Sequence, residues 1–307
     1  MIKTKNLEDL LDKEQARKIF ASYREELNLS SNFQIQTIHR HIALSPFTYA
    51  LLCKVSDDYK IIKFRANASQ EQSRQPAFKV MEFLREKFLG PKFFIPQVCF
   101  YDSDYNLLVY KNTEGTPFIN QLRAGSLESE ISLCGQWLKK LHLIRNFKSL
   151  TIPHHQIFFN FPALKKYYPK LADQGPLLVD KWQKKIVNKI TPCLIHGDFQ
   201  PNNIIIDSQK IIVFDYTDSE IADPVIDVVR FLVQMKVMLF RFASPYKYKD
   251  IESIFLKNYA LPLNKNNFQI YAKITYLQIL GTIAAAIPFE EEARGILSEV
   301  YKYFKDD

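Results

Sequence analysis

The stretch LIHGDFQPNNIIID, residues 194–207, constrains the fold most, because it sets a histidine, an aspartate and two asparagines between apolar runs. The run Ile204–Ile206 has the composition of a short buried strand. A four-residue turn separates it from a second apolar strand, Ile211–Phe214, which Asp215 follows. Pairing the two strands as a hairpin brings Asn203 and Asp215 to the same end. The sequence therefore predicts a hairpin with polar residues gathered at one end.

The hydrophobic pattern on either side of this hairpin predicts two different parts. Antiparallel strands are expected over 33–65 and in a second hairpin over 97–112, because apolar and polar residues alternate there. Helical spacing predicts helices over 6–29, 75–88, 127–144, 178–190, 224–242, 249–259, 266–286 and 289–305. This is an α+β organisation, with a β-rich lobe over 1–111, a mainly helical lobe over 112–307, and a hinge near 111–116.

Composition narrows the class of protein. Lys and Arg number 41 against 33 Asp and Glu, a net charge of +8, but no basic run or nucleic-acid motif accompanies it, so no nucleic-acid partner is expected. The N-terminal residues are polar, unlike a secretory signal, and the apolar stretch Ile274–Phe289 is too short to span a bilayer. The four cysteines are widely spaced without a CxxC pair, which predicts reduced thiols. We expect a soluble, cytoplasmic protein with no membrane partner.

The polar residues of the hairpin suit phosphoryl transfer. An Asn carbonyl at 203 and a carboxylate at 215 are oxygen ligands that suit Mg²⁺, which water and substrate phosphates would complete. Asp198, on the loop before Asn203, could accept a proton from an attacking hydroxyl. The alternative is that Asp198 and Asn203 cap turns and that His196 is a core histidine. The fixed spacing of all of these residues favours the catalytic interpretation.

The segments HGDFQPNN and VFDYTDSEIADPVIDVVRFL resemble the aminoglycoside phosphotransferase and choline kinase family of small-molecule kinases. The family pattern is matched in order by His196, Asp198, Asn203, Asp215, Asp223, Pro224 and Asp227. The resemblance implies a protein-kinase-like two-lobed fold and transfer of the γ-phosphate of ATP, with GTP left open. It implies Asp198 as the catalytic base and Asn203 and Asp215 as Mg²⁺ ligands. His196, Asp223 and Asp227 would give structural support.

The same resemblance implies nucleotide-binding residues in the first lobe. Lys63, late in the strand YKIIKFR, is expected to bind the nucleotide phosphates, with Lys60 as the runner-up. The segment LLVYKNTEGTPF resembles the hinge, so the backbone near Tyr110 and Lys111 would bind the purine. The phosphate-covering loop reads ALSPFTY, where Ser45 could contribute.

Three positions depart from the family pattern. The loop with Ser45 contains no glycine, and Ala222 stands where the family usually has one. The helix after Lys63 should carry a glutamate partner, but Glu71 and Glu82 are both displaced from the family position. These departures keep an alternative open, namely an inactive pseudokinase with a binding or regulatory role.

The acceptor is expected to be a small molecule rather than a protein. Protein kinases carry Lys where this chain has Gln200, and residues 216–222 leave no room for a long activation segment. Residues 228–289 are rich in Lys, Arg and aromatic residues, with Asp250 and Glu252 as their only acids. This favours a neutral or anionic sugar, polyol or amino alcohol over a polycationic aminoglycoside. Choline or ethanolamine stays open because aromatic side chains can enclose a cationic amine. Nothing in the sequence predicts the oligomeric state.

Overall fold

The computed structural model describes residues 5–41, 47–122, 127–147, 150, 159–187, 191–207, 209–286 and 290–306. The chain divides into two compact units. The first consists of Met1–Gly115 with Ile212–Thr217, and the second of Thr116–Ile211 with Asp218–Asp307.

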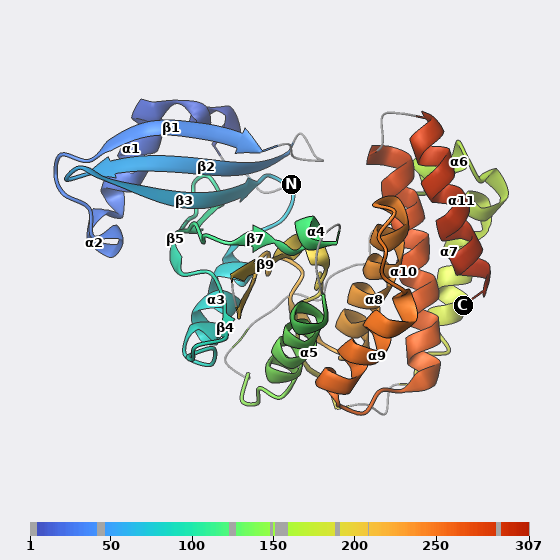
Figure 1. Ribbon diagram of the computed structural model, residues 1–307. Helices are drawn as coiled ribbons and strands as arrows, with labels where there is room; N and C mark the ends of the chain where they lie inside the picture. The colour runs from blue at the N-terminus through green and yellow to red at the C-terminus, as the bar shows by residue number, and fades with distance from the viewer. Residues whose placement is uncertain are drawn as a thin grey trace. The chain divides into compact units, whose positions relative to one another are not determined.

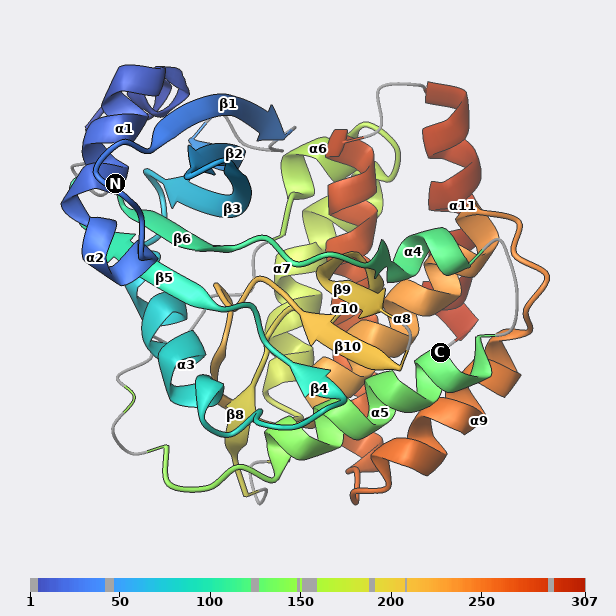
Figure 2. The ribbon, with the colours of Figure 1, turned by 60° about the vertical axis from the view of Figure 1, so that its left-hand side comes forward.

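The first unit is built on an antiparallel sheet with strand order β1–β2–β3–β6–β5 (Figures 1 and 2). Its strands are β1 (Gln34–His41), β2 (Thr48–Asp57), β3 (Lys60–Ser69), β5 (Val98–Asp102) and β6 (Leu107–Lys111). In β3 the side chains of Phe64, Ala66 and Ala68 are buried, whereas Lys63 is exposed and Arg65 is half-buried. Because side chains alternate along a strand, Lys63 and Arg65 share the face opposite the core.

Short helical segments cover the core face of this sheet. A single helix over 6–29 was expected, but the structure has η1 (Leu7–Leu11), α1 (Lys13–Ser22) and α2 (Arg24–Leu27). Local capping explains the breaks. The Asp12 side chain accepts from the backbone N–H of Gln15, which starts α1, and Asn28 ends α2 in a left-handed conformation with φ 52°. Phe20 packs edge-on against Phe64 with ring centroids 5.3 Å apart.

The helix α3 (Gln75–Arg85) follows β3 and packs against β5 (Figure 2). Its apolar residues at helical spacing are buried, which agrees with the pattern expected over 75–88. Arg74 occupies its N-cap position. The short strand β4 (Phe93–Phe94) comes next in the chain.

The second unit is mainly helical. Its helices are α4 (Phe118–Gln121), α5 (Glu128–His142), α6 (Phe161–Lys165), α7 (Pro169–Gln183), α8 (Val225–Arg241), α9 (Tyr248–Tyr259), α10 (Lys265–Ala286) and α11 (Glu290–Asp306). The helix α5 packs against α9, and α10 packs against α8 and α11 (Figures 1 and 2). The core contains apolar side chains from α6, α7, α8, α10 and α11.

The expected helix over 178–190 was wrong in its bounds. The helix α7 begins at Pro169 and ends at Gln183, and it contains Pro176. Its first-turn proline suits a helix start, and Leu171, Gly175 and Val179 lie on its buried face at helical spacing. Pro176 does not end the helix, because tertiary packing outweighs the backbone hydrogen bond that Pro176 cannot make.

Short strands position the polar hairpin. In the second unit β8 (Cys193–Ile195) pairs antiparallel with β11 (Glu220–Ala222), and β7 (Thr116–Pro117) pairs with β9 (Ile204–Asp207). The turn η2 (Pro201–Asn203) leads into β9. The strand β10 (Lys210–Val213) begins in the second unit and ends in the first. Within the described residues, no helix combines the length and apolar character needed to cross a membrane.

Candidate active site

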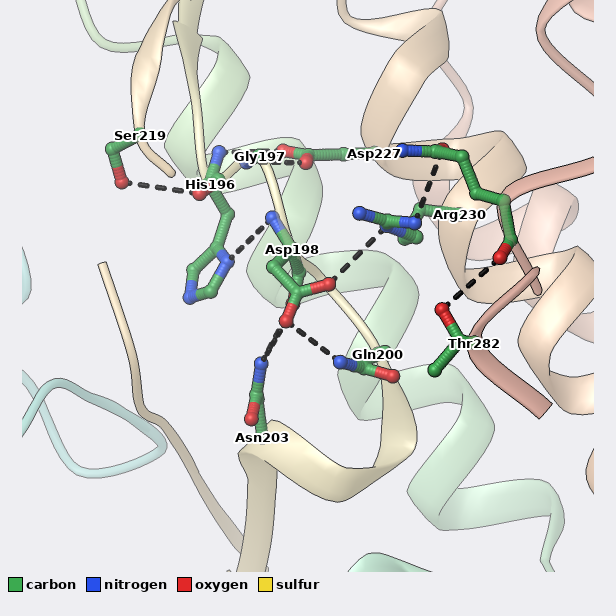
Figure 3. Close-up of polar contacts among 10 residues, drawn as sticks. His196, Gly197, Asp198, Gln200, Asn203, Ser219, Asp227, Arg230 and Thr282 are labelled. Carbon is green, nitrogen blue, oxygen red and sulfur yellow. Dashed lines mark hydrogen bonds and ion pairs between the residues drawn. The ribbon is translucent and has the colours of Figure 1, made fainter. Parts of the chain in front are cut away.

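Asp198 lies on the loop between β8 and β9, where the chain holds both of its carboxylate oxygens (Figure 3). Its Oδ2 accepts from the side-chain amides of Gln200 at 2.6 Å and Asn203 at 2.9 Å. Its Oδ1 lies 3.2 Å from Nε of Arg230. The Asp198 side chain keeps 19% of its surface exposed. The carboxylate is therefore held in one orientation and stays partly accessible to solvent.

Arg230 was missed by the sequence reasoning. It lies one turn after Asp227 on α8, and its Nη1 also donates to Oε1 of Gln278 on α10 at 3.4 Å (Figure 3). Its side chain is 18% exposed. The sequence carries only a weak signal for Arg230. The family motif ends near this position, and Arg230 follows Asp227 by three residues, which puts the two side chains on neighbouring sides of α8.

Asn203 is oriented by the same loop. Its Nδ2 donates to the backbone carbonyl and to Oδ2 of Asp198, both at 2.9 Å. This network assigns Nδ2 to the donor role, which leaves Oδ1 of Asn203 as the atom able to bind a cation.

Gly197 is required by the loop geometry. Its φ is +81°, and a Cβ placed there would lie 1.8 Å from the carbonyl oxygen of Asp218. No other residue fits without moving the backbone. The neighbouring His196 is fully buried and edge-on to Trp137 at 6.3 Å. Its carbonyl accepts from Ser219, and its Nδ1 accepts from the backbone N–H of Asp198 (Figure 3). His196 is therefore placed to shape the loop.

Asp227 anchors the loop from α8. Its two carboxylate oxygens accept the backbone N–H groups of His196 at 2.7 Å and Gly197 at 2.8 Å (Figure 3). Its Oδ2 lies 3.0 Å from Nε2 of His142, whose Nδ1 is 2.8 Å from the hydroxyl of Tyr259. Burial alone would raise the pKa of Asp227, but His142 and the groups of His196 outweigh it and hold this pKa below its usual value.

Asp223 ties the start of α8 to α10. Its Oδ1 accepts from the backbone N–H of Val225 at 3.0 Å, and its Oδ2 accepts from the side-chain amide of Asn267 at 2.8 Å. Both bonds are structural, and they satisfy a donor at the helix N-terminus.

Asp215 lies in the first unit and has a left-handed backbone, with φ 62°. Such a conformation is uncommon outside glycine, and it is found often at functional sites. The Thr217 hydroxyl donates to Asp215 Oδ1 at 2.6 Å, and the guanidinium of Arg74 donates to that hydroxyl. Neither Arg74 nor this relay was anticipated from the sequence, which gives no signal that links α3 to residue 217.

Two cations share one face of β3, and they differ in surroundings. Lys63 is exposed, and its ammonium forms no ion pair with any described residue. Arg65 is half-buried: its Nε donates to Oδ1 of Asn112 at 2.7 Å, and its guanidinium lies 5.5 Å from the ring centroid of Phe214. Arg65 therefore lies beside Phe214, the residue that precedes Asp215. Strand alternation alone could have singled it out together with Lys63.

The expected hinge lies at the end of β6. Tyr110 is buried and accepts a hydrogen bond from Asn67 at 3.3 Å. Burial, and next the nearby charge of Asp215, raise the pKa of Tyr110 to about 12. The N–H of Lys111 already donates to the carbonyl of Gln97 at 2.9 Å, so only its carbonyl is left for a purine.

The remaining expected residues are less informative. Ser45 lies outside the described residues. Glu71 and Glu82 are both exposed, and neither forms an ion pair with Lys63. Among the residues that the structure describes, no group of three or more His, Cys, Asp or Glu side chains could hold a metal ion.

Comparisons with known proteins show the family and the fold of this chain. No curated protein matches the sequence of the chain. Solved structures do match in fold: the ethanolamine kinase of Plasmodium vivax has a TM-score of 0.63 at 15% identity, covering 98% of this chain and 94% of that one. The choline kinase of Streptococcus pneumoniae has a TM-score of 0.62 at 14% identity, covering 95% and 99%. These neighbours confirm the expected α+β, protein-kinase-like fold.

An amicoumacin kinase in complex with AMP-PNP and Ca²⁺ is also similar, with a TM-score of 0.62 at 16% identity and coverage of 95% of each chain. A family model described as the phosphotransferase enzyme family matches residues 54–246, more than half of the chain. This match confirms the resemblance seen in the sequence and the expectation of a phosphotransferase. The chain belongs to the phosphotransferase enzyme family.

Proposed function

We propose that the protein transfers the γ-phosphate of ATP to a hydroxyl group of a small molecule, with Asp198 as the general base. The observation that carries this proposal is the environment of Asp198, whose carboxylate is held by Gln200, Asn203 and Arg230 yet remains partly exposed. A fixed, accessible carboxylate is what in-line attack by a hydroxyl requires.

The metal ligands in the proposal are Asn203 and Asp215, each of which keeps one side-chain oxygen free of hydrogen bonds from the described residues. Mg²⁺ is the ion proposed, because it accepts few protein oxygens and completes its shell with water and phosphate. The AMP-PNP and Ca²⁺ bound by the amicoumacin kinase support nucleotide and divalent-metal use in this fold. When bound, the ion would neutralise charge on the transferred phosphoryl group.

The nucleotide is proposed to bind through residues 1–111 and the acceptor through residues 112–307. Lys63 and Arg65 would face the phosphates, and Tyr110 and Lys111 the purine, with the Lys111 carbonyl as the available backbone group. Ser45 would contribute from the phosphate-covering loop. We leave GTP as a second possible donor and propose a cytoplasmic location.

The acceptor proposed is a sugar, a polyol or an amino alcohol, and more readily a neutral or anionic molecule than a polycation. Arg230 beside Asp198 supports this class, because a guanidinium at the reacting hydroxyl disfavours a polycation. The choline and ethanolamine kinases among the structural neighbours support an amino alcohol.

The test is transfer of γ-labelled phosphate from Mg·ATP, and in parallel Mg·GTP, into separate pools of sugars, polyols, amino alcohols and aminoglycosides. Asp198→Asn is the matched blank, since it keeps the shape and most hydrogen bonds of the loop. We expect label in one pool with the wild type and a loss of about 10³-fold or more in Asp198→Asn. Equal labelling by both proteins would remove Asp198 from the role of base.

The second candidate is an inactive pseudokinase, favoured by the exposed Lys63, which forms no ion pair with any glutamate that the structure describes. It predicts no labelled product in any pool and no Mg²⁺-dependent binding of ATP or ADP. Binding of nucleotide is measured by calorimetry on the same preparation, so that a missing acceptor is told apart from a missing nucleotide site.

A further inference from the structure

A second concave region lies among α8, α9 and α10, and no residue of the Asp198 loop lines it (Figure 1 shows the three helices). The cavity has a volume of about 680 Å³, within the range of small-molecule sites in proteins. Val233 and Lys236 line it from α8, and Phe268, Ala272 and Tyr276 from α10.

Positive charge dominates the cavity wall. Lys236, Lys247 and Lys249 line it together with a single acid, Glu252. The carboxylate of Glu252 accepts a hydrogen bond from the Tyr248 hydroxyl at 3.1 Å. Three ammonium groups around one concave surface attract anions, and the low-dielectric walls concentrate that field.

Lys236 is held in place by aromatic rings rather than left free in solvent. Its ammonium lies 4.3 Å from the ring centroid of Tyr303, 5.3 Å from that of Tyr248 and 5.7 Å from that of Tyr276. Cation–π contacts of this kind fix a long side chain in advance. A fixed ammonium loses little conformational entropy when it binds an anion, which raises affinity.

Part of the wall is apolar, with Val233, Phe268 and Ala272. An ion such as free phosphate would leave this surface in contact with water, whereas a larger molecule would cover it. We propose that this cavity binds a small molecule that carries a phosphate or carboxylate group on an apolar or ring-shaped body.

This cavity is distinct from the surroundings of Arg230, the cation beside Asp198. Arg230 lies one helical turn before Val233 on α8, does not line the cavity, and is engaged by Asp198 and Gln278. The anion could belong to the acceptor itself or to a second molecule that acts as an effector. An acceptor and an effector would each carry the anionic group and the apolar or ring-shaped body named above. Binding measured without nucleotide does not depend on the proposed kinase function.

The first test is calorimetry on the full chain with phenyl phosphate, and with benzyl alcohol as its neutral counterpart. We expect phenyl phosphate to bind with Kd below about 1 mM and benzyl alcohol not to bind at about 10 mM. The double variant Lys247→Met, Lys249→Met should bind phenyl phosphate with an affinity lower by about fivefold or more. The reason is that two exposed cations are removed without a change in the core. Lys257→Met is the control, since Lys257 is exposed on the same helix but does not line the cavity.

A separate variant, Lys236→Met, should abolish the remaining binding, with folding checked by Tm. The proposal is overturned if phenyl phosphate fails to bind, or if the double variant and Lys257→Met bind it equally. The source of the anion is decided with glucose 6-phosphate in the presence of Mg·ATP. A second phosphate gained by the sugar, seen by phosphorus NMR, marks the cavity as part of the acceptor site, and binding without conversion marks an effector site.

Discussion

The guanidinium of Arg74 donates to the hydroxyl of Thr217 at 2.5 Å, and that hydroxyl donates to Asp215 at 2.6 Å. Arg74 and Thr217 are 8% and 9% exposed, so the bond between them is shielded from water. This relay joins the start of α3 to the carboxylate that we propose as a metal ligand.

Breaking the relay should weaken metal-dependent nucleotide binding. Arg74→Met and Thr217→Val remove the groups that orient Asp215, and partners one step removed from a metal typically change metal affinity by about tenfold or more. We expect the affinity for ADP in the presence of Mg²⁺ to fall by about tenfold, with the affinity in its absence unchanged. Calorimetry with and without Mg²⁺ measures both.

The conservative variants Arg74→Lys and Thr217→Ser provide the control for this prediction. Each keeps the donor or the hydroxyl, so each should recover part of the Mg²⁺ dependence. A purely structural role for Arg74 would appear as a lower Tm with the Mg²⁺ dependence intact, and Asp215→Asn shows whether the metal uses this carboxylate at all.

The two cations on β3 are expected to contribute unequally to nucleotide affinity. Arg65 is half-buried beside Phe214, whereas Lys63 is exposed to solvent, so a phosphate meets Arg65 in the lower dielectric. Arg65→Met should lower the affinity for Mg·ATP by about tenfold, and Lys63→Met should lower it by about threefold or less. Nucleotide titration of both variants checks the order, and a larger loss in Lys63→Met would restore the lysine to the principal role.

The sequence was most informative where chemistry is local in the chain. Asp198, Asn203 and Gly197 belong to one short loop, and the strands and helices around them follow from alternation and helical spacing. Arg74 contacts Thr217 across 143 residues of chain, and His142 contacts Asp227 across 85. No short motif marks either residue. The helix over 169–183 was expected over 178–190, and it contains Pro176, a residue that local rules place at or beyond a helix end.

Gly197→Ala should destabilise the loop that carries Asp198. A Cβ would meet the Asp218 carbonyl at 1.8 Å, at a φ that L-residues rarely adopt, and we expect a cost of at least about 2 kcal/mol together with loss of transfer. Gly295→Ala is the matched control, because a Cβ there meets nothing within 4 Å and alanine favours the helix by up to about 1 kcal/mol. Chemical denaturation measures both, and equal stability of the two variants contradicts the steric argument.

Asp227 should make the stability of the protein depend on acidity. Its pKa is lower in the folded chain than the usual value, so the ionised carboxylate stabilises the fold above about pH 4, and this contribution is lost as the pH falls through the folded pKa. Asp227→Asn should cost about 3 kcal/mol at pH 7, because it leaves His142 and the loop without their buried anion.

The free energy of unfolding of wild type and Asp227→Asn, measured between about pH 3 and pH 7, tests this sign. The difference between the two free energies of unfolding should be constant near neutrality and become smaller at acid pH. Protonation of Asp227 removes from the wild type the same negative charge that the substitution removes from the variant. Asp180→Asn is the control, since Asp180 forms only an exposed pair with Lys184 and should change stability by less than about 0.5 kcal/mol. A gap that stays the same at every pH would assign the stabilisation to hydrogen bonds that the amide also makes, and not to the charge of Asp227.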